Sequence, residues 1–168
     1  MDDVAVHLLD RENLDRIEPL WNALREHHAT VAPELGVPRS REESWQRRRA
    51  QYEVWLSEPG SFILVAECPG ELVGYAMVHL RSGSSTWPLG EHVGEIETLS
   101  VLPAARGQGI GTALLAAVRE ELRAVGVTEL SLLVLPGNLA AIGFYERSGF
   151  NTFGLWLRVG DGSPPPGA

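Results

Sequence analysis

Leu99-Ser100-Val101-Leu102-Pro103-Ala104-Ala105-Arg106-Gly107-Gln108-Gly109-Ile110-Gly111-Thr112 is the stretch of sequence that decides the fold. It starts as an apolar run typical of a strand and stops at Pro103. A short loop with Arg106 and three glycines follows. Apolar residues then recur every three or four positions from Ile110 to Leu122, which is a helical spacing. The stretch therefore predicts a strand, a glycine-rich loop and the start of a helix.

A loop of this kind can bind a phosphate group. The first turn of a helix has four N–H groups without intrahelical partners, and the helix dipole is positive there. Glycines remove the side chains that would keep an anion away from the backbone. Two common phosphate motifs do not match: no Lys-Ser or Lys-Thr pair follows the glycines, as Walker A requires, and Thr112 stands where the dinucleotide fingerprint needs its third glycine.

The pattern that does match is R-x-x-G-x-G preceded by L-x-V-x-P, at Arg106, Gly109, Gly111, Leu99, Val101 and Pro103. It resembles the pyrophosphate-binding motif of the GNAT superfamily of acyl-CoA-dependent N-acyltransferases. The resemblance implies that acetyl-CoA is the cosubstrate and that backbone groups around Leu99 and Val101 pair with its pantetheine arm. It also places the pyrophosphate at Arg106, Gly107, Gln108, Gly109, Ile110, Gly111 and Thr112. The alternative is an ordinary glycine-rich connection between a strand and a helix.

A second cluster, residues 138–150, resembles the GNAT pattern N-x-x-A-I-x-F-Y-x-x-x-G-F without a gap. The resemblance implies that Asn138 contacts the pantetheine arm and that the Tyr145 hydroxyl is the general acid for the departing thiolate. Each residue also has a plain structural interpretation. Asn138 suits a helix N-cap, and Tyr145 can be an aromatic residue of the core.

Glu95 and Glu97 precede the glycine loop on the same predicted strand. Because side chains alternate along a strand, two residues at i and i+2 share a face. An amine that attacks a thioester must lose a proton, so Glu97 or Glu95 is a candidate general base, directly or through a water molecule. The family often carries a base on this strand. The residues do not say which of the two acts, and both can simply be solvated.

The composition excludes several classes of protein. The net charge of −8 argues against nucleic-acid binding, which requires a basic face. No apolar run approaches the ~20 residues of a membrane span, and the N-terminus lacks a signal-peptide pattern. The single cysteine, Cys68, cannot form an internal disulfide, so we expect a cytoplasmic protein. His27 and His28 are adjacent and therefore poorly spaced as metal ligands, and no metal is expected.

The element order along the chain predicts an α/β protein, β-α-α-β-β-β-α-β-α-β. The strands are expected at Val4–Leu9, Ser61–Glu67, Leu72–Arg81, Val93–Val101, Leu130–Leu135 and Phe150–Val159, and the helices at Arg11–Thr30, Ser40–Leu56, Gly109–Ala124 and Leu139–Arg147. The order is similar to that of GNAT proteins, which implies a mixed central sheet with helices on both faces. One domain is expected over residues 1–159, followed by a disordered Gly/Pro-rich tail over 160–168.

Local signals add detail to two of the helices. Asp10 is placed to cap the first, and Ser40 with Glu43 fits the capping box S-x-x-E of the second. A stripe along the second helix, Trp45, Arg49, Tyr52 and Leu56, is expected to face the core or an acceptor pocket. The polar loop over residues 82–90 carries an exposed Trp87 and is a candidate for specificity.

The sequence therefore predicts an acetyltransferase that moves an acetyl group from acetyl-CoA to a primary amine by direct transfer. The alternative is a non-catalytic acyl-CoA sensor on the same fold. The acceptor, a small molecule or a protein amine, stays open, as does the acyl-chain preference. The protein is expected to be a monomer or a homodimer.

Overall fold

The computed structural model describes residues 4–157. The chain forms two compact units, which are described separately. The first contains residues up to Leu24 and Arg39–Leu133, and the second contains Arg25–Pro38 and the chain from Val134 onward.

The first unit is built on one mixed sheet. Among the described residues, its strands are β1 (Ala5–Leu8), β2 (Phe62–Cys68), β3 (Glu71–Ser82), β4 (His92–Val101) and β5 (Glu129–Leu132), in that order across the sheet. All neighbours are antiparallel except β4 and β5, which run parallel. This arrangement confirms the predicted α/β class.

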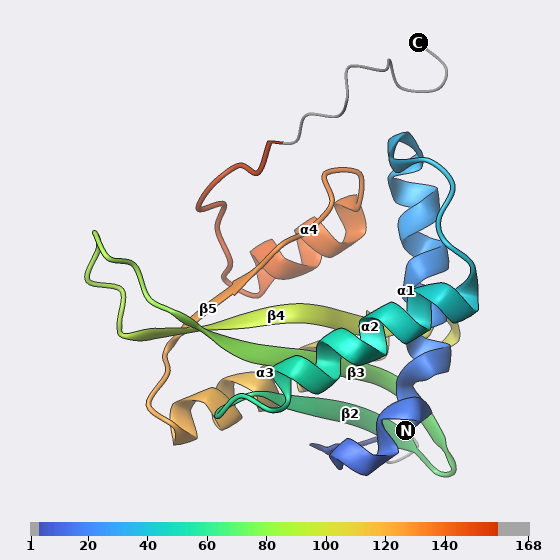
Figure 1. Ribbon diagram of the computed structural model, residues 1–168, viewed down its shortest axis with the longest axis horizontal. Coiled ribbons are helices and arrows are strands. Elements are labelled where there is room, and N and C mark those ends of the chain that lie inside the picture. Colours follow the sequence, from blue (N-terminus) through green and yellow to red (C-terminus); the bar gives the residue numbers. More distant parts are fainter. Residues whose placement is uncertain (1–3, 158–168) are drawn as a thin grey trace. The chain divides into compact units, whose positions relative to one another are not determined.

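Helices cover both faces of the sheet. The Cβ directions of Tyr75 and Gly74 point to opposite faces because the two residues are consecutive in β3. Tyr75 lies in the core with α2 (Arg41–Trp55), whereas a Cβ atom on Gly74 would lie 3.2 Å from Leu114 of α3 (Ile110–Ala124). Figure 1 shows α2 in front of β3 and β4 and α3 behind them.

The core under α2 is apolar and tightly covered. It gathers side chains from the start of the chain, from α2 and from the hairpin: Leu14, Ile17, Leu20, Trp45, Tyr52, Ile63, Val65, Leu72, Tyr75 and Met77. Burial of such side chains supplies the main stabilisation of a domain of this size.

The first predicted helix is divided in two. Residues Arg11–Ile17 form a 3₁₀ helix, η1, and α1 follows over Glu18–Val31. Pro19 explains the division, because it has no N–H group to donate to the Asp15 carbonyl. Instead, the N–H of Glu18 donates to Asp15 three residues earlier, which is the 3₁₀ pattern. Asp10 lies at the N-cap of η1 but makes no side-chain capping bond, so that expectation was wrong.

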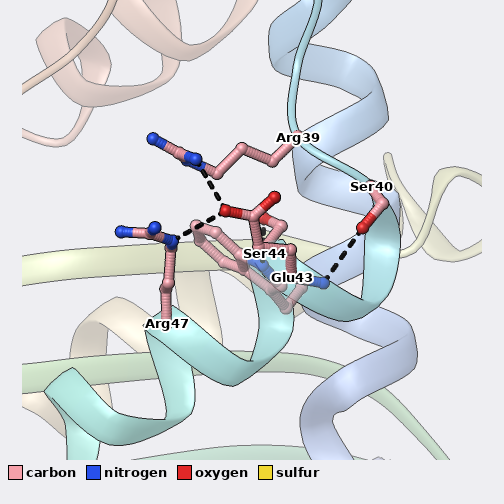
Figure 2. Close-up of polar contacts among 6 residues, drawn as sticks. Arg39, Ser40, Glu43, Ser44 and Arg47 are labelled. Carbon is pink, nitrogen blue, oxygen red and sulfur yellow. Dashed lines mark hydrogen bonds and ion pairs between the residues drawn. The ribbon is translucent and has the colours of Figure 1, made fainter.

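The start of α2 follows its sequence signal. The backbone N–H of Glu43 donates to Oγ of Ser40 at 3.1 Å, as expected of an N-cap serine. The Glu43 carboxylate takes part in a second set of contacts, shown in Figure 2: Oε1 accepts from Arg39 at 2.6 Å and from Arg47 at 3.0 Å. These two guanidinium groups hold the pKa of the Glu43 carboxyl below its usual value.

Two strand predictions need correction. The strand expected to reach Leu135 ends at Leu132, because β4 pairs with it only from Val93 to Ile96. The strand expected at Phe150–Val159 is absent over residues 150–157, which have no regular structure. Apolar residues alternate there, but a strand also needs a hydrogen-bonded neighbour, and Phe153 and Leu155 are both 85% exposed. Residues 158–168, with the predicted tail, lie outside the described residues.

In the second unit, the turn around Gly137 contacts the end of α1. The unit contains the residues of α1 from Arg25 to Val31, a 3₁₀ turn at Pro33–Leu35 and α4 (Leu139–Arg147). The contact is close: a Cβ atom built on Gly137 would lie 1.9 Å from the Val31 carbonyl oxygen, so this position requires glycine. Gly149, at φ 90°, follows the end of α4.

Candidate active site

The glycine loop connects β4 to α3 through two residues in the left-handed backbone conformation. Gly107 has φ 76° and Gly109, the N-cap of α3, has φ 82°, values that favour glycine. The first intrahelical bond runs from the N–H of Ala113 to the Gly109 carbonyl at 2.9 Å. The N–H groups of Ile110, Gly111 and Thr112 therefore precede it, and no side chain caps this helix.

Side chains of the loop fix its path. Nε of Arg106 donates to the Val101 carbonyl at 3.1 Å, and Nε2 of Gln108 donates to the Ala104 carbonyl at 3.2 Å. Arg106 and the glycines beside it are exposed. The structure thus brings the predicted phosphate-contacting residues together at one helix N-terminus with a cation beside it, an arrangement suited to an anion.

Leu99 and Val101 lie at the end of β4, where one edge of the strand has no strand partner in the described chain. They pair with Ala76 and Gly74 of β3. On the other side the pairing with β5 stops at Ile96. The backbone of this edge is consequently open to pairing with an extended ligand, in the manner of an added strand.

Glu97 occupies a β-bulge in β4. Thr98 pairs with Met77 and Ile96 pairs with Val78, so Glu97 is the extra residue between them. Glu95 lies opposite His79 in the same register. Contacts to His79 and to α2 place Glu97 on that face as well, so the two carboxylates share a face as predicted. Val101 lies four positions after Glu97, about 13 Å along the strand.

Each carboxylate has a cationic neighbour. Glu95 forms an ion pair with Arg81 of β3. Oε1 of Glu97 lies 3.2 Å from Nε2 of His79, and Oε2 lies 3.7 Å from Nη1 of Arg48 on α2. The side chains of Glu95 and Glu97 keep 21% and 25% of their surface exposed. Both can therefore be reached from solvent while their orientation is held.

Aromatic rings surround Arg48, a residue that sequence analysis did not select. Its guanidinium carbon lies 4.4 Å from the ring centroid of Trp21, with Tyr52 and Trp55 at 5.5 and 5.9 Å. Trp55 also stacks on His79, with centroids 4.7 Å apart and rings 4° from parallel. The available signal was the spacing of Arg48 from Tyr52 and Trp55, which is four and seven residues along one helix face.

A cluster of buried hydroxyl groups lies next to Glu97 on the α2 face of the sheet. The Tyr52 hydroxyl lies 2.6 Å from Oγ1 of Thr98 and 3.1 Å from the Tyr75 hydroxyl. Burial is the first cause of the raised pKa of Tyr52 and of the strongly raised pKa of Tyr75. Both phenols therefore stay neutral, and the Tyr52 hydroxyl links Tyr75 to Thr98, the residue next to Glu97.

Asn138 is the N-cap of α4, which its sequence position suggested. Its Oδ1 accepts from the Ala141 N–H at 3.4 Å and lies 3.2 Å from Nε2 of His27 on α1. Asn138 is buried, with 7% of its surface exposed. Oδ1 is the acceptor atom of the side chain, and the amide NH₂ is its donor group. His27 was not predicted to take part.

Tyr145 lies on α4 between two aromatic rings. Its centroid is 5.1 Å from that of Phe144 and 5.5 Å from that of Phe150, which stands edge-on to it. Burial raises the pKa of Tyr145 to about 12, so the hydroxyl keeps its proton at neutral pH. This state is the one a general acid requires, and it also fits the alternative of a core aromatic residue.

Neither a metal-ligand cluster nor a membrane-spanning helix is found among the described residues. Within residues 4–157, no group of three His, Cys, Asp or Glu side chains gathers as metal ligands would. In the same part of the chain, no helix is long and apolar enough to cross a membrane. His27 and His28 lie in α1, and His28 belongs to its last turn.

Comparisons with known proteins agree with this geometry. A family model described as the acetyltransferase (GNAT) family matches residues 21–150. Mycothiol acetyltransferase of Thermobispora bispora is 34% identical over 140 residues, which are 80% of this chain and 43% of that protein. Its counterpart in Cellulomonas flavigena is 33% identical over 151 residues, 89% of this chain and 41% of that protein. The chain spans about two fifths of the length of these relatives.

Solved structures share the fold. Aminoglycoside N-acetyltransferase AAC(6')-Iy, in complex with CoA, superposes with a TM-score of 0.71 at 18% identity, covering 97% of both chains. A tetramutant of the BH1408 protein from Bacillus halodurans gives a TM-score of 0.76 at 20% identity, covering 93% of this chain and 99% of that one. At such identities the likeness concerns the fold alone.

Proposed function

Because the chain belongs to the acetyltransferase (GNAT) family, we propose that it transfers an acetyl group from acetyl-CoA to the primary amine of an acceptor. One relative is named for mycothiol and one solved structure of the same fold is named for aminoglycosides, so membership of the family does not identify the acceptor amine. The observation that carries the proposal is the glycine loop, with its left-handed Gly107 and Gly109 and the uncapped helix start behind them.

The cosubstrate is proposed to lie along the end of β4 and over the start of α3. Its pyrophosphate accepts hydrogen bonds from backbone N–H groups between Gln108 and Thr112, beside the Arg106 guanidinium. Its pantetheine arm runs along the open edge near Leu99 and Val101, toward the carboxylates. The Asn138 amide supplies a further hydrogen bond to this arm. Acetyl-CoA brings the activated thioester, and the protein supplies position and proton transfer.

Glu97 is proposed as the general base. It lies in the bulge with His79 at 3.2 Å, whereas Glu95 is occupied by Arg81. The acceptor arrives as an ammonium ion and gives one proton to Glu97, directly or through a water molecule. The neutral nitrogen then attacks the thioester carbonyl carbon. The new C–N bond forms, and backbone N–H groups near Leu99 and Val101 stabilise the oxyanion.

Collapse of that intermediate breaks the C–S bond. The departing thiolate takes a proton from the Tyr145 hydroxyl, which returns to its neutral form by taking the proton that remains on the amide nitrogen, through solvent. Burial keeps this donor protonated throughout the working range of pH, because it raises the pKa of Tyr145 to about 12. The products are an N-acetylated acceptor and free CoA.

Two measurements test the proposal together. Gly111 is not among the glycines with positive φ, so its backbone accepts other residues. Gly111→Glu places a carboxylate where the phosphates are proposed to lie. Acetyl-CoA affinity, measured by calorimetry, should fall well over tenfold, at least ~1.4 kcal/mol. Gly111→Ala is the matched control, since it adds bulk without charge and should bind much more tightly than the Glu variant.

Thiol release over a panel of amines then separates an enzyme from a binding module. An enzyme releases CoA with at least one amine, whereas a sensor binds acetyl-CoA and releases none. Unchanged acetyl-CoA affinity in a folded Gly111→Glu protein would contradict the proposed phosphate site.

A further inference from the structure

The face of the sheet that carries Glu97 also carries a guanidinium group that is only loosely paired. Nη1 of Arg48 lies 3.7 Å from Oε2 of Glu97, which is beyond hydrogen-bond distance. The side chains of Arg48 and Glu97 expose 22% and 25% of their surface. The two opposite charges therefore lie side by side, both reach solvent, and neither holds the other by a direct hydrogen bond.

Arg48 is held in place by rings rather than by Glu97. Its guanidinium lies over Trp21 at 4.4 Å, within the range of a cation–π interaction. Trp21 is itself fixed, because its Nε1 donates to Oγ of Ser44 at 3.1 Å. Trp55 is fixed by its stacking on His79. The guanidinium fork consequently keeps its position when the Glu97 carboxylate turns to another partner.

The charges on this face balance. Arg48 comes from α2, His79 and Arg81 from β3, and Glu95 and Glu97 from β4. Two arginines face two glutamates, and the histidine adds charge only when protonated. The net charge of −8 of the chain therefore does not extend to this face. A polyamine would bring several positive charges against two guanidinium groups, which is unfavourable.

We propose that the acceptor is a primary amine with a carboxylate one or two carbons away from it, as in an amino acid; the inference rests on the proposed acetyltransferase function. Its carboxylate pairs with the Arg48 fork, whose planar donors match a carboxylate in two parallel hydrogen bonds. Its ammonium group pairs with Glu97, the proposed base. The 3.7 Å separation of the two protein charges is close to that of the two charges of a zwitterion of this size.

Matched pairs of substrates test this assignment. Each common amino acid is compared with its amide, which keeps the amine and side chain and loses only the negative charge. Initial rates of thiol release are measured with acetyl-CoA, and spermidine serves as the polycation. At least one amino acid should exceed its amide tenfold or more in kcat/KM, mainly through KM. Amides that equal or exceed every acid, or a preference for spermidine, would overturn the inference.

Variants of α2 test whether Arg48 causes the preference for an amino acid over its amide. Arg48→Met keeps the length of the side chain and removes the fork, and the acid-to-amide ratio should fall toward one. Arg47→Met is the control one residue away, since Arg47 pairs with Glu43 instead, and the ratio should persist. Arg48→Lys keeps the charge without the fork, should give an intermediate ratio, and replaces the Met variant if that one fails to fold. A ratio unchanged in the Arg48 variants contradicts the assignment.

A binding measurement keeps this inference separate from the proposed function. The protein, alone and with CoA, is titrated calorimetrically with the favoured amino acid and its amide. Thiol release with polyamines or aminoglycosides only would uphold the acetyltransferase and overturn the acceptor class. If acetyl-CoA does not bind, the proposed function fails, and the acid–amide difference in the titration of the protein alone still decides whether Arg48 holds a carboxylate.

Discussion

Tyr145→Phe is the most informative single substitution, because it removes a hydroxyl whose protonation state follows from its burial. Burial raises the pKa of Tyr145 from its ordinary value of 10 to about 12 in the folded protein. Below pH 10 the phenol is neutral in both the folded and the unfolded chain, so it does not make stability depend on pH. Above pH 10 only the unfolded chain ionises at this site, and folding stability is lost until the folded pKa is reached.

The expected magnitude follows from these two values. A difference of two in pKa corresponds to about 2.7 kcal/mol when the loss is complete, and about 1.4 kcal/mol of it is lost by pH 11. The Tyr145→Phe variant should not show this loss of folding stability. Urea unfolding at pH 8 and pH 11 measures it: the free energy of unfolding should fall by about 1.4 kcal/mol less in the variant than in the parent. Tyr52 and Tyr75, whose pKa values are also raised, contribute equally to both proteins.

Activity gives the second half of this prediction. If Tyr145 is the general acid, kcat should fall by roughly 10²-fold in the Phe variant, while acetyl-CoA affinity changes little. The parent enzyme should also show no loss of activity from Tyr145 ionisation below pH 10. Equal alkaline destabilisation of the two proteins would refute the raised pKa. A parental rate in the Tyr145→Phe variant would indicate that Tyr145 is an aromatic residue of the core without a catalytic role.

Three further predictions follow from contacts. Glu97→Gln should lower kcat by at least roughly 10²-fold and most at low pH, where free amine is scarce, whereas Glu95→Gln should lower it less; equal pH–rate profiles for the two would contradict the choice of base. His27→Phe removes the partner of Asn138 at 3.2 Å and should weaken acetyl-CoA binding severalfold by calorimetry, an effect that His27→Gln should reduce. Tyr52→Phe leaves the Thr98 hydroxyl without its 2.6 Å partner and should cost about 1–3 kcal/mol in urea unfolding.

Local signals predicted much of this fold. The helix over Leu139–Arg147 and the Ser40 cap match their patterns, because capping residues and glycines act through neighbours a few residues away. Exposure of Trp87, 62% in the structure, was also expected from its polar loop. The strand predicted from Phe150 onward is wrong over residues 150–157, because an alternating pattern does not indicate whether a partner strand is present.

The site was predicted less completely than the fold. The expected stripe on α2 placed Arg49 on the inner face, but Arg49 pairs with Asp15 at 2.8 Å and with Glu53 at 2.5 Å, toward solvent. Arg48 takes the place beside the aromatic rings instead. A helical repeat of 3.6 residues does not distinguish two adjacent arginines without knowledge of what lies opposite. The contact of His27 with Asn138 joins residues 111 positions apart, and no local pattern encodes it.

The extra residue in β4 changes the side-chain parity of the strand. Up to Glu95, odd-numbered residues face α2; from Thr98 onward, even-numbered residues do, as the contacts of Thr98 with Tyr52 and of Ser100 with the Leu20 carbonyl require. Deleting Glu97 to obtain an ideal strand would leave Ile96 and Thr98 opposite consecutive residues of β3, so both halves of β4 would keep their faces. Glu95 and the buried hydroxyls of Thr98 and Ser100 would still face α2, and only the Glu97 carboxylate would be missing. A designer who regularised β4 would thus gain a better-paired sheet and lose the proposed base, because the irregular position is the one that Glu97 occupies.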